Sequence, residues 1–336
     1  HGLRLFGITM HFRNFKPFSK VSALTLGGGG IGQVWGETTK EEAIQTVHSA
    51  LDHGINHFDV APMYGKGEAE RVLGEALKGI PIEEINVTTK CRLGTLPDEQ
   101  VYDYLNQSLT RSLDCMNLQR VDLFLLHSQL IEDDFNLFSN NETRNRTSTS
   151  LTSYHNAVIP AFERLKAEGK IGHWGIGGLG QQAALRQAIN HETKPEAIQC
   201  VVNPLNSAGA IGYVDKEYDP GLILDESRRN EIPILGIRAV QAGALTAKMD
   251  REPHASGYDQ LDFDDYERAA PFRELANHWN ESAASLAHRY ALSATKVSSV
   301  ILGVKNRNEL RECLDSEQKG KLTAGQMEEI EKALTL

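Results

Sequence analysis

Short, continuously apolar segments alternate with longer amphipathic ones along almost the whole chain. Segments of the first kind predict β-strands buried on both faces, and apolar residues spaced three or four apart predict helices. The predicted strands occupy residues 21–28, 56–61, 85–90, 121–128, 171–178, 197–206, 232–240 and 297–304. The predicted helices occupy residues 40–53, 68–79, 98–116, 157–169, 181–190, 221–230, a pair within 271–293, 307–316 and 324–335.

Strands that are each followed by a helix predict a parallel sheet covered by helices. A count of eight favours the closed (β/α)8 TIM barrel, an α/β fold, over an open sheet. Because the composition does not change abruptly, the 336 residues are predicted to form a single domain. Two connections, residues 129–153 and 241–270, are longer than the others. In a barrel both emerge at the carboxyl ends of the strands, where we expect extended loops that act as lids or substrate walls.

A glycine-rich segment follows the first predicted strand, and its spacing Gly27-x-Gly29-x-x-Gly32 matches a dinucleotide-binding fingerprint. In a Rossmann fold the last glycine opens a helix whose N-terminus meets the pyrophosphate. Here six residues separate Gly32 from the first helix-capping position, and Asp52, at the spacing of the usual acidic residue, falls inside the helix. The segment is therefore predicted to be a loop at the mouth of the first strand.

Four side chains suited to proton transfer stand at the ends of consecutive predicted strands. Asp59 and Tyr64 follow the second strand, Lys90 ends the third and His127 ends the fourth. Each alone could be a turn former, a buried aromatic, a solvated lysine or a core histidine. Four such coincidences at adjacent strand ends are not expected, so we predict that these side chains converge on the catalytic face of the barrel.

These four residue types indicate proton transfer by a phenol. A free tyrosine has a pKa of about 10, too high for ready proton exchange at neutral pH, and a nearby ammonium favours the phenolate. Asp59 would hold Lys90 in place and keep it protonated, while His127 would orient a carbonyl oxygen or relay the proton. Such a set protonates the oxygen formed when hydride reaches a carbonyl carbon, or removes that proton in the reverse reaction.

The segment GINHFDVAPMYGKGEAERVLGEAL, taken with Lys90 and His127, resembles the aldo-keto reductases, and the resemblance extends over nearly the whole chain. It implies a (β/α)8 barrel that binds NADP, or alternatively NAD, without a Rossmann fold. The tetrad of that family falls on Asp59, Tyr64, Lys90 and His127. The segments VVNPLNSAG, GIRAVQAGALT and REPHAS are similar to the branch that contains aldose and galactose dehydrogenases. The implied substrate is therefore a sugar or another small carbonyl compound.

The resemblance also implies a set of cofactor-binding residues: Gly29, Gly30, Gln199, Arg238, Gly243, Leu245, Gly303, Lys305 and Glu309. Lys305 could pair with a 2′-phosphate, which would favour NADP, or could be a solvated lysine at a helix start. The chain departs from many relatives at Gly177-Gly178, at Cys313 and at Arg238-Ala239, where Ser-Asn, Asn and Ser-Pro are common. Arg238 is expected to contact the pyrophosphate instead.

The bulk properties restrict the partners and the compartment. A net charge of -10 argues against nucleic acid, and no apolar run approaches the ~18 residues of a membrane span. The N-terminal segment lacks the apolar core of a signal peptide, and the four cysteines are dispersed, as expected for reduced thiols in a cytoplasmic protein. The sequence suggests no metal site and leaves the oligomeric state open.

The favoured interpretation is an NAD(P)-dependent oxidoreductase that interconverts a carbonyl and an alcohol. One alternative is a cofactor-binding regulatory or redox-sensing subunit without significant turnover, against which the intact tetrad argues. Another is a barrel aldolase in which Lys90 forms a Schiff base. Asp59 beside that lysine would keep it charged and unreactive, which argues against the aldolase.

Overall fold

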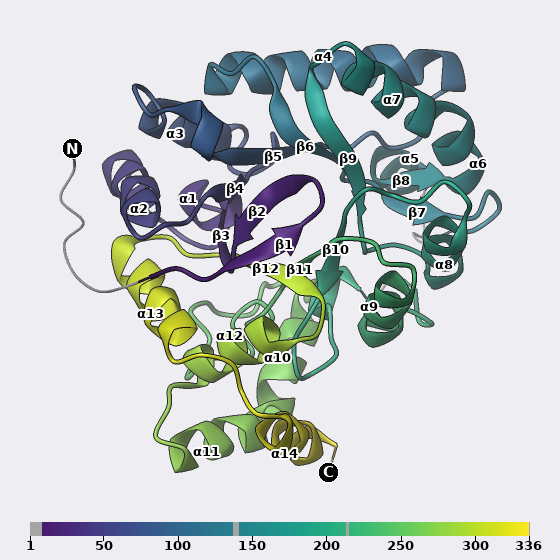
Figure 1. Ribbon diagram of the computed structural model, residues 1–336. Helices are drawn as coiled ribbons and strands as arrows, with labels where there is room; N and C mark the ends of the chain where they lie inside the picture. Colours follow the sequence, from purple (N-terminus) through teal and green to yellow (C-terminus); the bar gives the residue numbers. More distant parts are fainter. Residues whose placement is uncertain (1–8, 137–140, 213–214, 336) are drawn as a thin grey trace.

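The computed structural model describes residues 9–136, 141–212 and 215–335, and at its centre eight parallel strands close into a barrel (Figure 1). The barrel strands are β3 (Leu24–Gly27), β4 (His57–Asp59), β5 (Asn86–Cys91), β6 (Val121–Leu126), β9 (Ile171–Gly177), β10 (Ile198–Val201), β11 (Ile234–Ile237) and β12 (Val297–Leu302). Around the barrel they follow the order β10, β11, β12, β3, β4, β5, β6, β9. The (β/α)8 prediction is confirmed, and each strand lies within a predicted segment or extends one residue beyond it.

Helices surround the barrel in the order that the amphipathic segments predicted (Figure 1). They are α2 (Lys40–Asp52), α3 (Glu68–Ala76), α4 (Asp98–Met116), α7 (Ile159–Ala167), α8 (Gln182–Asn190), α9 (Pro220–Arg229), α11 (Ala270–His278), α12 (Ala283–Ser293), α13 (Arg307–Gln318) and α14 (Ala324–Leu334). Short 3₁₀ turns lie at Ile82–Glu84 and Gly209–Ile211, and a π-helical turn at Tyr154–Val158 leads into α7. Helix α2 begins where the sequence indicates, because the hydroxyl of Thr39 accepts a hydrogen bond from the Glu42 amide at 3.1 Å.

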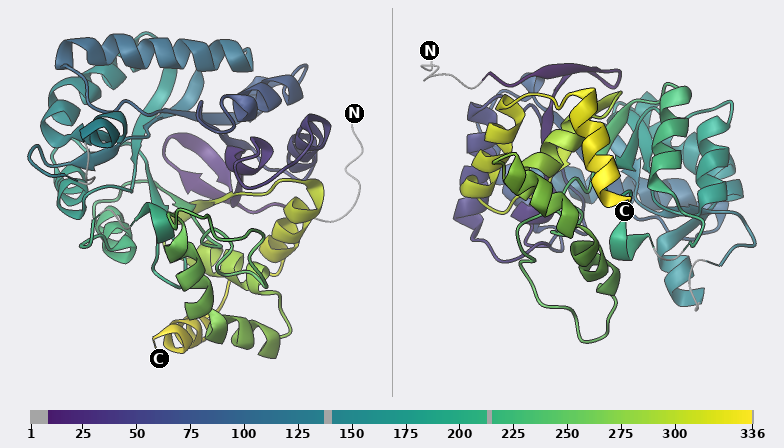
Figure 2. Two further views of the ribbon diagram at one scale, coloured as in Figure 1. Left: turned by 180° about the vertical axis from the view of Figure 1, so that it is seen from behind. Right: turned by 90° about the horizontal axis from the view of Figure 1, so that it is seen from below.

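The first predicted strand, 21–28, is too long at its amino end. Val21 and Ser22 belong to β2 (Phe18–Ser22), which forms a hairpin with β1 (Phe12–Phe15). The sequence pattern did not separate this hairpin from the barrel strand. Phe15 and Phe18 are buried against apolar side chains of the barrel interior. The hairpin therefore closes the amino end of the barrel, at the top of the right-hand view of Figure 2.

The connection 129–153 is not a plain loop. It holds β7 (Gln129–Ile131), α5 (Asn141–Thr147), β8 (Ser148–Ser150) and α6 (Leu151–Ser153). Strands β7 and β8 pair in parallel as a separate two-stranded sheet. Three residues are too few to display a period of two, so the sequence pattern could not predict them.

The connection 241–270 contains a further helix, α10 (Gln260–Arg268), which the hydrophobic pattern also missed. Asp262 and Asp265 form its buried face, and both carboxylates accept hydrogen bonds from residues of neighbouring loops. An inward face made of aspartates is the reverse of the apolar stripe that identifies a helix from sequence. Both long connections project from the end of the barrel opposite the hairpin (Figure 2, right).

The glycine-rich segment forms a short helix, α1 (Gly28–Ile31), where a loop was predicted. A Cβ atom on Gly30 would lie 1.8 Å from the carbonyl oxygen of Val304, and one on Gly27 would lie 2.2 Å from that of Leu302. The glycines thus allow β3 and α1 to approach the backbone of the last strand and its extension. They serve barrel packing, and the Rossmann alternative is excluded by the closed barrel.

Within the described ranges, no helix has the length and apolar character needed to cross a membrane. The four cysteines are free thiols, three of them buried and Cys115 half-buried. They therefore act as small packing residues, as predicted from their dispersed positions.

Candidate active site

The structure brings Asp59, Tyr64 and Lys90 into direct contact at the carboxyl ends of β4 and β5. The Lys90 ammonium donates to Asp59 Oδ1 at 2.5 Å, to the carbonyl oxygen of Val60 at 3.0 Å and to the Tyr64 hydroxyl at 3.2 Å. An ammonium has three protons, so its donor capacity is filled by these three acceptors. The Lys90 and Asp59 side chains are only 1% and 3% exposed, which makes this a buried ion pair.

A glycine-rich turn after β4 positions the phenol. The Tyr64 amide donates to the carbonyl oxygen of Ala61, and the Tyr64 carbonyl accepts from the amide of Ala69 in the first turn of α3. Gly65 between them has a φ of +64°, and a Cβ there would lie 2.0 Å from the carbonyl oxygen of Gly32. The glycine segment after β3 and this turn therefore fix each other, and with them the place of the tyrosine.

The charge state of Lys90 follows from its surroundings. Burial by itself would lower the pKa of Lys90, but the carboxylate of Asp59 and the hydroxyl of Tyr64 outweigh burial and raise the pKa above its ordinary value. Lys90 is therefore an ammonium at neutral pH. It lacks the free electron pair that a Schiff-base lysine needs.

His127 completes the predicted group of four. Its ring stands edge-on to the Tyr64 ring, with centroids 6.0 Å apart and planes at 89°, and its amide donates to the carbonyl oxygen of Cys91 at 2.8 Å. Burial, followed by the positive charges of Lys90 and Arg92, holds the pKa of His127 well below its usual value. The imidazole is therefore neutral at physiological pH, able to donate one hydrogen bond and accept another.

Gln199 lies against the same group. Its side-chain amide nitrogen donates to Asp59 Oδ2 at 2.6 Å, and the residue is almost fully buried. Asp59 is thus held by Lys90 on one oxygen and by Gln199 on the other. Sequence reasoning assigned Gln199 to the nicotinamide amide by resemblance, and did not predict its contact with the carboxylate.

Beneath this group, the barrel interior is polar and hydrogen-bonded. His57 Nδ1 shares a hydrogen bond with the Thr25 hydroxyl at 2.8 Å, and Nε2 with the Thr88 hydroxyl at 2.7 Å. Burial, with the charge of Lys90 as a second cause, lowers the pKa of His57 to about 3. This neutral layer separates the ion pair from the hydrophobic amino end of the barrel.

The residues predicted to bind a dinucleotide share one side of the barrel. They lie on or after four consecutive strands: Gln199 on β10; Arg238, Gly243 and Leu245 after β11; Gly303, Lys305 and Glu309 after β12; and Gly29 and Gly30 after β3. Positions that are up to 280 residues apart in sequence therefore form one continuous part of the rim.

Two of these residues are already engaged within the protein. The Arg238 side chain is only 10% exposed and approaches Asp262 at 3.4 Å, while its Nε donates to Gln241 at 2.7 Å. The Leu245 side chain is buried in a hydrophobic cluster, and its amide donates to the carbonyl oxygen of Val240 at 3.1 Å. The charge of Arg238 is thus compensated internally, which the sequence did not indicate.

Lys305 and Glu309 form a closed pair at the other end of this rim. The Lys305 ammonium donates to Glu309 Oε1 at 2.6 Å, and the Lys305 amide donates to Glu309 Oε2 at 2.7 Å. Asp250 is a second carboxylate, 3.8 Å from the same ammonium. The sequence left open a lysine that pairs with a 2′-phosphate and a solvated lysine at a helix start. Lys305 is not simply solvated, because it is paired with Glu309, and its pairing with a 2′-phosphate stays a prediction.

Trp35 is a side chain of this rim that sequence reasoning missed. A Cβ on Gly29 would lie 2.4 Å from its indole nitrogen, and one on Gly303 would lie 3.3 Å from the same atom. The indole covers both predicted dinucleotide positions while remaining 41% exposed. A large aromatic directly after a glycine run and outside any predicted strand was the available signal.

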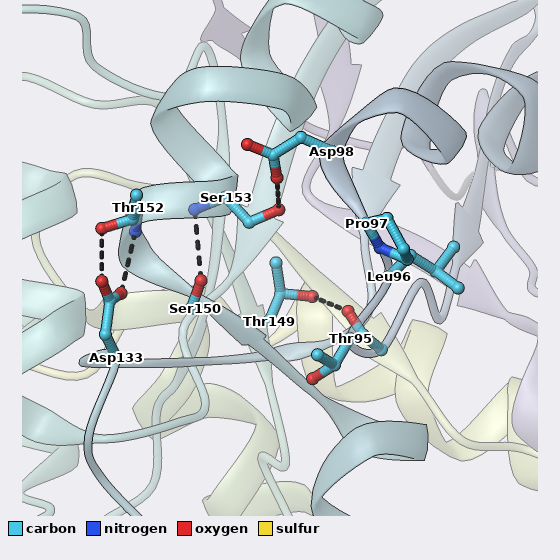
Figure 3. A pocket seen from close by; sticks show the side chains of 10 residues that line it. Thr95, Leu96, Pro97, Asp98, Asp133, Thr149, Ser150, Thr152 and Ser153 are labelled. Carbon is cyan, nitrogen blue, oxygen red and sulfur yellow. Dashed lines mark hydrogen bonds between the residues drawn. The ribbon is translucent and has the colours of Figure 1, made fainter.

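A polar cavity of about 220 Å³ lies between the segment after β5 and the segments that contain β7 and β8 (Figure 3). Two of its hydroxyls are bound by its own carboxylates: Ser153 donates to Asp98 at 2.8 Å, and Thr152 to Asp133 at 2.6 Å. The hydroxyls of Thr95 and Thr149 donate to backbone carbonyls. None of the predicted catalytic residues lines it. Its groups therefore brace the loops around the site.

Comparison with known proteins assigns residues 23–335 to the pattern of the aldo/keto reductase family. The L-galactose dehydrogenase of Arabidopsis thaliana is 33% identical over 48% of this chain, a match that spans only 46% of that protein. The D-threo-aldose 1-dehydrogenase of a Pseudomonas species is 24% identical over 84% of this chain and 85% of its own length. A solved aldo-keto reductase from Klebsiella pneumoniae in complex with NADPH has the same fold, with a TM-score of 0.64 and 18% identity over 96% and 95% of the two chains.

Proposed function

Because the chain belongs to the aldo/keto reductase family and is an NAD(P)-dependent oxidoreductase, we propose that it interconverts a carbonyl and an alcohol with Tyr64 as the proton donor and acceptor. The observation that supports this most directly is the Lys90 ammonium, held between the carboxylate of Asp59 and the hydroxyl of Tyr64. Only a phenol whose conjugate base is stabilised can exchange its proton readily near neutral pH.

Residues of the chain itself carry out the proton transfer. A bound nicotinamide dinucleotide supplies hydride to the carbonyl carbon in reduction and accepts it in oxidation. In reduction the carbonyl oxygen takes the phenol proton of Tyr64, and the ammonium of Lys90 stabilises the phenolate that remains. Asp59 keeps Lys90 charged and in place, while Gln199 fixes Asp59. In oxidation the same phenolate takes the proton of the substrate alcohol.

His127 orients the substrate oxygen. Its imidazole is neutral and stands beside the Tyr64 ring, so it offers one N–H to a carbonyl oxygen without competing as a strong acid. Tyr64 and His127 together then bracket the oxygen from two sides. This division leaves proton transfer to the phenol.

The residues on the rim from β10 to β3 fit a long dinucleotide. Gly303 is exposed, and a side chain there would fill the surface beside Trp35. The glycine therefore leaves space beside the indole for the dinucleotide. Gln199 would hold the nicotinamide amide, Gly29 and Gly30 would lie near its ribose, and Lys305 and Glu309 would hold the adenosine end. The segment with Arg238, Gly243 and Leu245 would lie along the pyrophosphate. Lys305 makes NADP a candidate cofactor, with NAD as the alternative.

The substrate is a small carbonyl compound, with an aldose as the first candidate. Similarity to an L-galactose dehydrogenase and a D-threo-aldose 1-dehydrogenase supports a sugar. The connections 129–153 and 241–270 project from the same end of the barrel as the tetrad and would form the walls around the substrate (Figure 2, right).

The test is a turnover screen. Purified protein is incubated with NADH or NADPH and a panel of aldehydes and aldoses, and with NAD or NADP and the matching alcohols, while absorbance of the reduced dinucleotide is followed. We expect turnover with at least one pair. Tight dinucleotide binding without turnover across the panel would favour a regulatory subunit instead. Borohydride trapping of substrate on Lys90 would favour an aldolase, which its ammonium state argues against.

A further inference from the structure

Two arginines stand at the rim beside the tetrad without a counter-charge. Arg92 lies two residues beyond Lys90, just after β5, and Arg146 lies in the last turn of α5. Neither guanidinium forms an ion pair or hydrogen bond with any residue in the ranges that the structure describes. Arg238, elsewhere on the rim, is by contrast neutralised by Asp262.

Backbone contacts fix the two arginines next to each other. The amide of Thr95 donates to the carbonyl oxygen of Asn145 at 2.7 Å. Gly94 has a φ of +71°, and a Cβ there would lie 2.9 Å from the carbonyl oxygen of Arg146. The segment after β5 and the end of α5 are therefore in contact. Because the His127 amide donates to the carbonyl oxygen of Cys91, the same segment also lies beside His127.

The charges of these side chains act on one another and on the tetrad. Burial first, and then the charge of Arg146, lower the pKa of Arg92, while the oxygen of Tyr64 acts in the opposite direction. Arg92 in turn contributes to the lowered pKa of His127. The two guanidiniums thus create a positive region next to the Tyr64 hydroxyl, in a protein whose net charge is -10.

This region lies on the other side of the barrel from the proposed dinucleotide phosphates. In the barrel order, β5 is directly opposite β11 and β6 is directly opposite β12. The segments proposed for the pyrophosphate and the adenosine end follow β11 and β12. Arg92 and Arg146 follow β5 and β6. They are consequently available to contact a substrate that binds over Tyr64.

Building on the proposed function, we propose that Arg92 and Arg146 together bind an anionic group of the substrate, a carboxylate or a phosphate. The preferred substrates are then acidic carbonyl compounds, such as sugar acids or sugar phosphates, in place of neutral aldehydes. A guanidinium matches either anion with paired N–H donors, and two of them side by side are repelled by each other until an anion joins them.

The test compares matched substrates that differ by one anion. The carboxylate pair is D-glucuronate and D-glucose, and the phosphate pair is glyceraldehyde 3-phosphate and glyceraldehyde. We expect wild-type protein to have the higher kcat/KM for the acidic member of at least one pair. Arg92→Gln and Arg146→Gln should each raise KM for that member about tenfold, the loss of one charged contact. For the neutral member kcat/KM should stay within about twofold, and salt should reduce the difference.

Arg120→Gln is the matched control, because Arg120 is exposed and lies before β6, at the amino end of the barrel. It removes the same charge and should leave every KM unchanged. Dinucleotide affinity should be the same in all three variants, which shows that the rim is intact. Equal kcat/KM within both pairs, or an unchanged KM in both rim variants, would overturn the proposal. No turnover of any of the four compounds, with turnover elsewhere in the panel of aldehydes and aldoses, would overturn this proposal alone. No turnover across the whole panel would overturn the proposed function as well.

Discussion

The tetrad and the proposed adenosine end both contain a lysine paired with a carboxylate, yet in opposite surroundings. At the tetrad, Lys90 and Asp59 are 1% and 3% exposed. At the adenosine end, Lys305 and Glu309 are 19% and 35% exposed, and the neighbouring pair of Arg307 and Glu42 is 54% and 27% exposed.

This difference in exposure determines whether each ion pair can rearrange. Removing one partner of a buried pair leaves a charge without water or counter-ion, so the pair can hardly rearrange. A half-exposed pair contributes little to stability and exchanges its partner easily. In the proposed function, the barrel interior therefore fixes the proton chemistry, while the choice of dinucleotide would depend on ion pairs that a ligand can reorganise.

The largest effect is expected at the tetrad for Tyr64→Phe. Removing the hydroxyl removes the proton donor, so turnover should fall by two to four orders of magnitude. Dinucleotide affinity should change less than about twofold, because only the hydroxyl is lost. Steady-state kinetics and a fluorescence titration measure the two quantities. Tyr104→Phe, at an exposed position on α4, is the control, and equal turnover in both variants would refute the role of Tyr64.

The second prediction compares the free energies of unfolding of two lysine variants. Lys90→Met strands the buried Asp59 carboxylate and should cost about 3–5 kcal/mol. Lys78→Met removes the partner of Glu75 in an exposed pair and should cost less than about 1 kcal/mol. Urea unfolding measures both values. If the two variants lose the same stability, the contrast between buried and exposed pairs does not hold here.

The contrast between buried and exposed groups also predicts how the free energy of unfolding depends on pH, through the buried histidines. Burial lowers the pKa of His288 to about 4, as it lowers that of His57 to about 3. The unfolded chain gains a proton at each below about pH 6.5, the folded protein does not, and stability therefore falls as pH falls through that window. The loss is about 2 kcal/mol per histidine at pH 5.

The variant His288→Gln isolates this contribution from that of the carboxylates. Its stability should fall less between pH 7 and pH 5 than that of the wild type, by about 2 kcal/mol. His278→Gln, at an exposed position, is the control and should follow the wild type. A pH dependence of unfolding that is identical in all three proteins would contradict the prediction.

The smallest effect is expected at the adenosine end. Glu309→Gln frees the Lys305 ammonium and removes a carboxylate from the place proposed for a 2′-phosphate. The affinity for NADPH relative to NADH should rise about tenfold, equivalent to roughly one charge contact. Titrations that follow tryptophan fluorescence measure the ratio, since Trp35 lies over this rim. Glu312→Gln, exposed on the same helix, should not change it; if it does so equally, the effect is one of net charge.

The parts predicted from sequence are those with strong local signals. Buried parallel strands are continuously apolar, so all eight were found, and the topology alone then brought Asp59, Lys90 and His127 to one rim. Helix α10 was not predicted because aspartates form its buried face. The hairpin β1–β2 was not predicted as a separate element because the apolar run continues from Val21 into the barrel strand.

The ion pairs between separate loops could not be predicted from the sequence. Arg238 and Asp262 meet only when the long connection folds back, and Lys305 gains Asp250 from a segment 55 residues earlier. Such contacts depend on loop conformations that leave no period in the chain. The same limit hid Arg92 and Arg146, whose proximity is set by the contact between two separate rim segments.

The most direct test of proton transfer by Tyr64 follows hydride transfer from a reduced dinucleotide that carries deuterium at both C4 positions of the nicotinamide. We expect the alcohol formed from an aldehyde to carry one deuterium on its former carbonyl carbon, and Tyr64→Phe, with dinucleotide bound, to form almost none of it. An alcohol without deuterium, or deuterium transfer at the wild-type rate in Tyr64→Phe, would contradict this expectation.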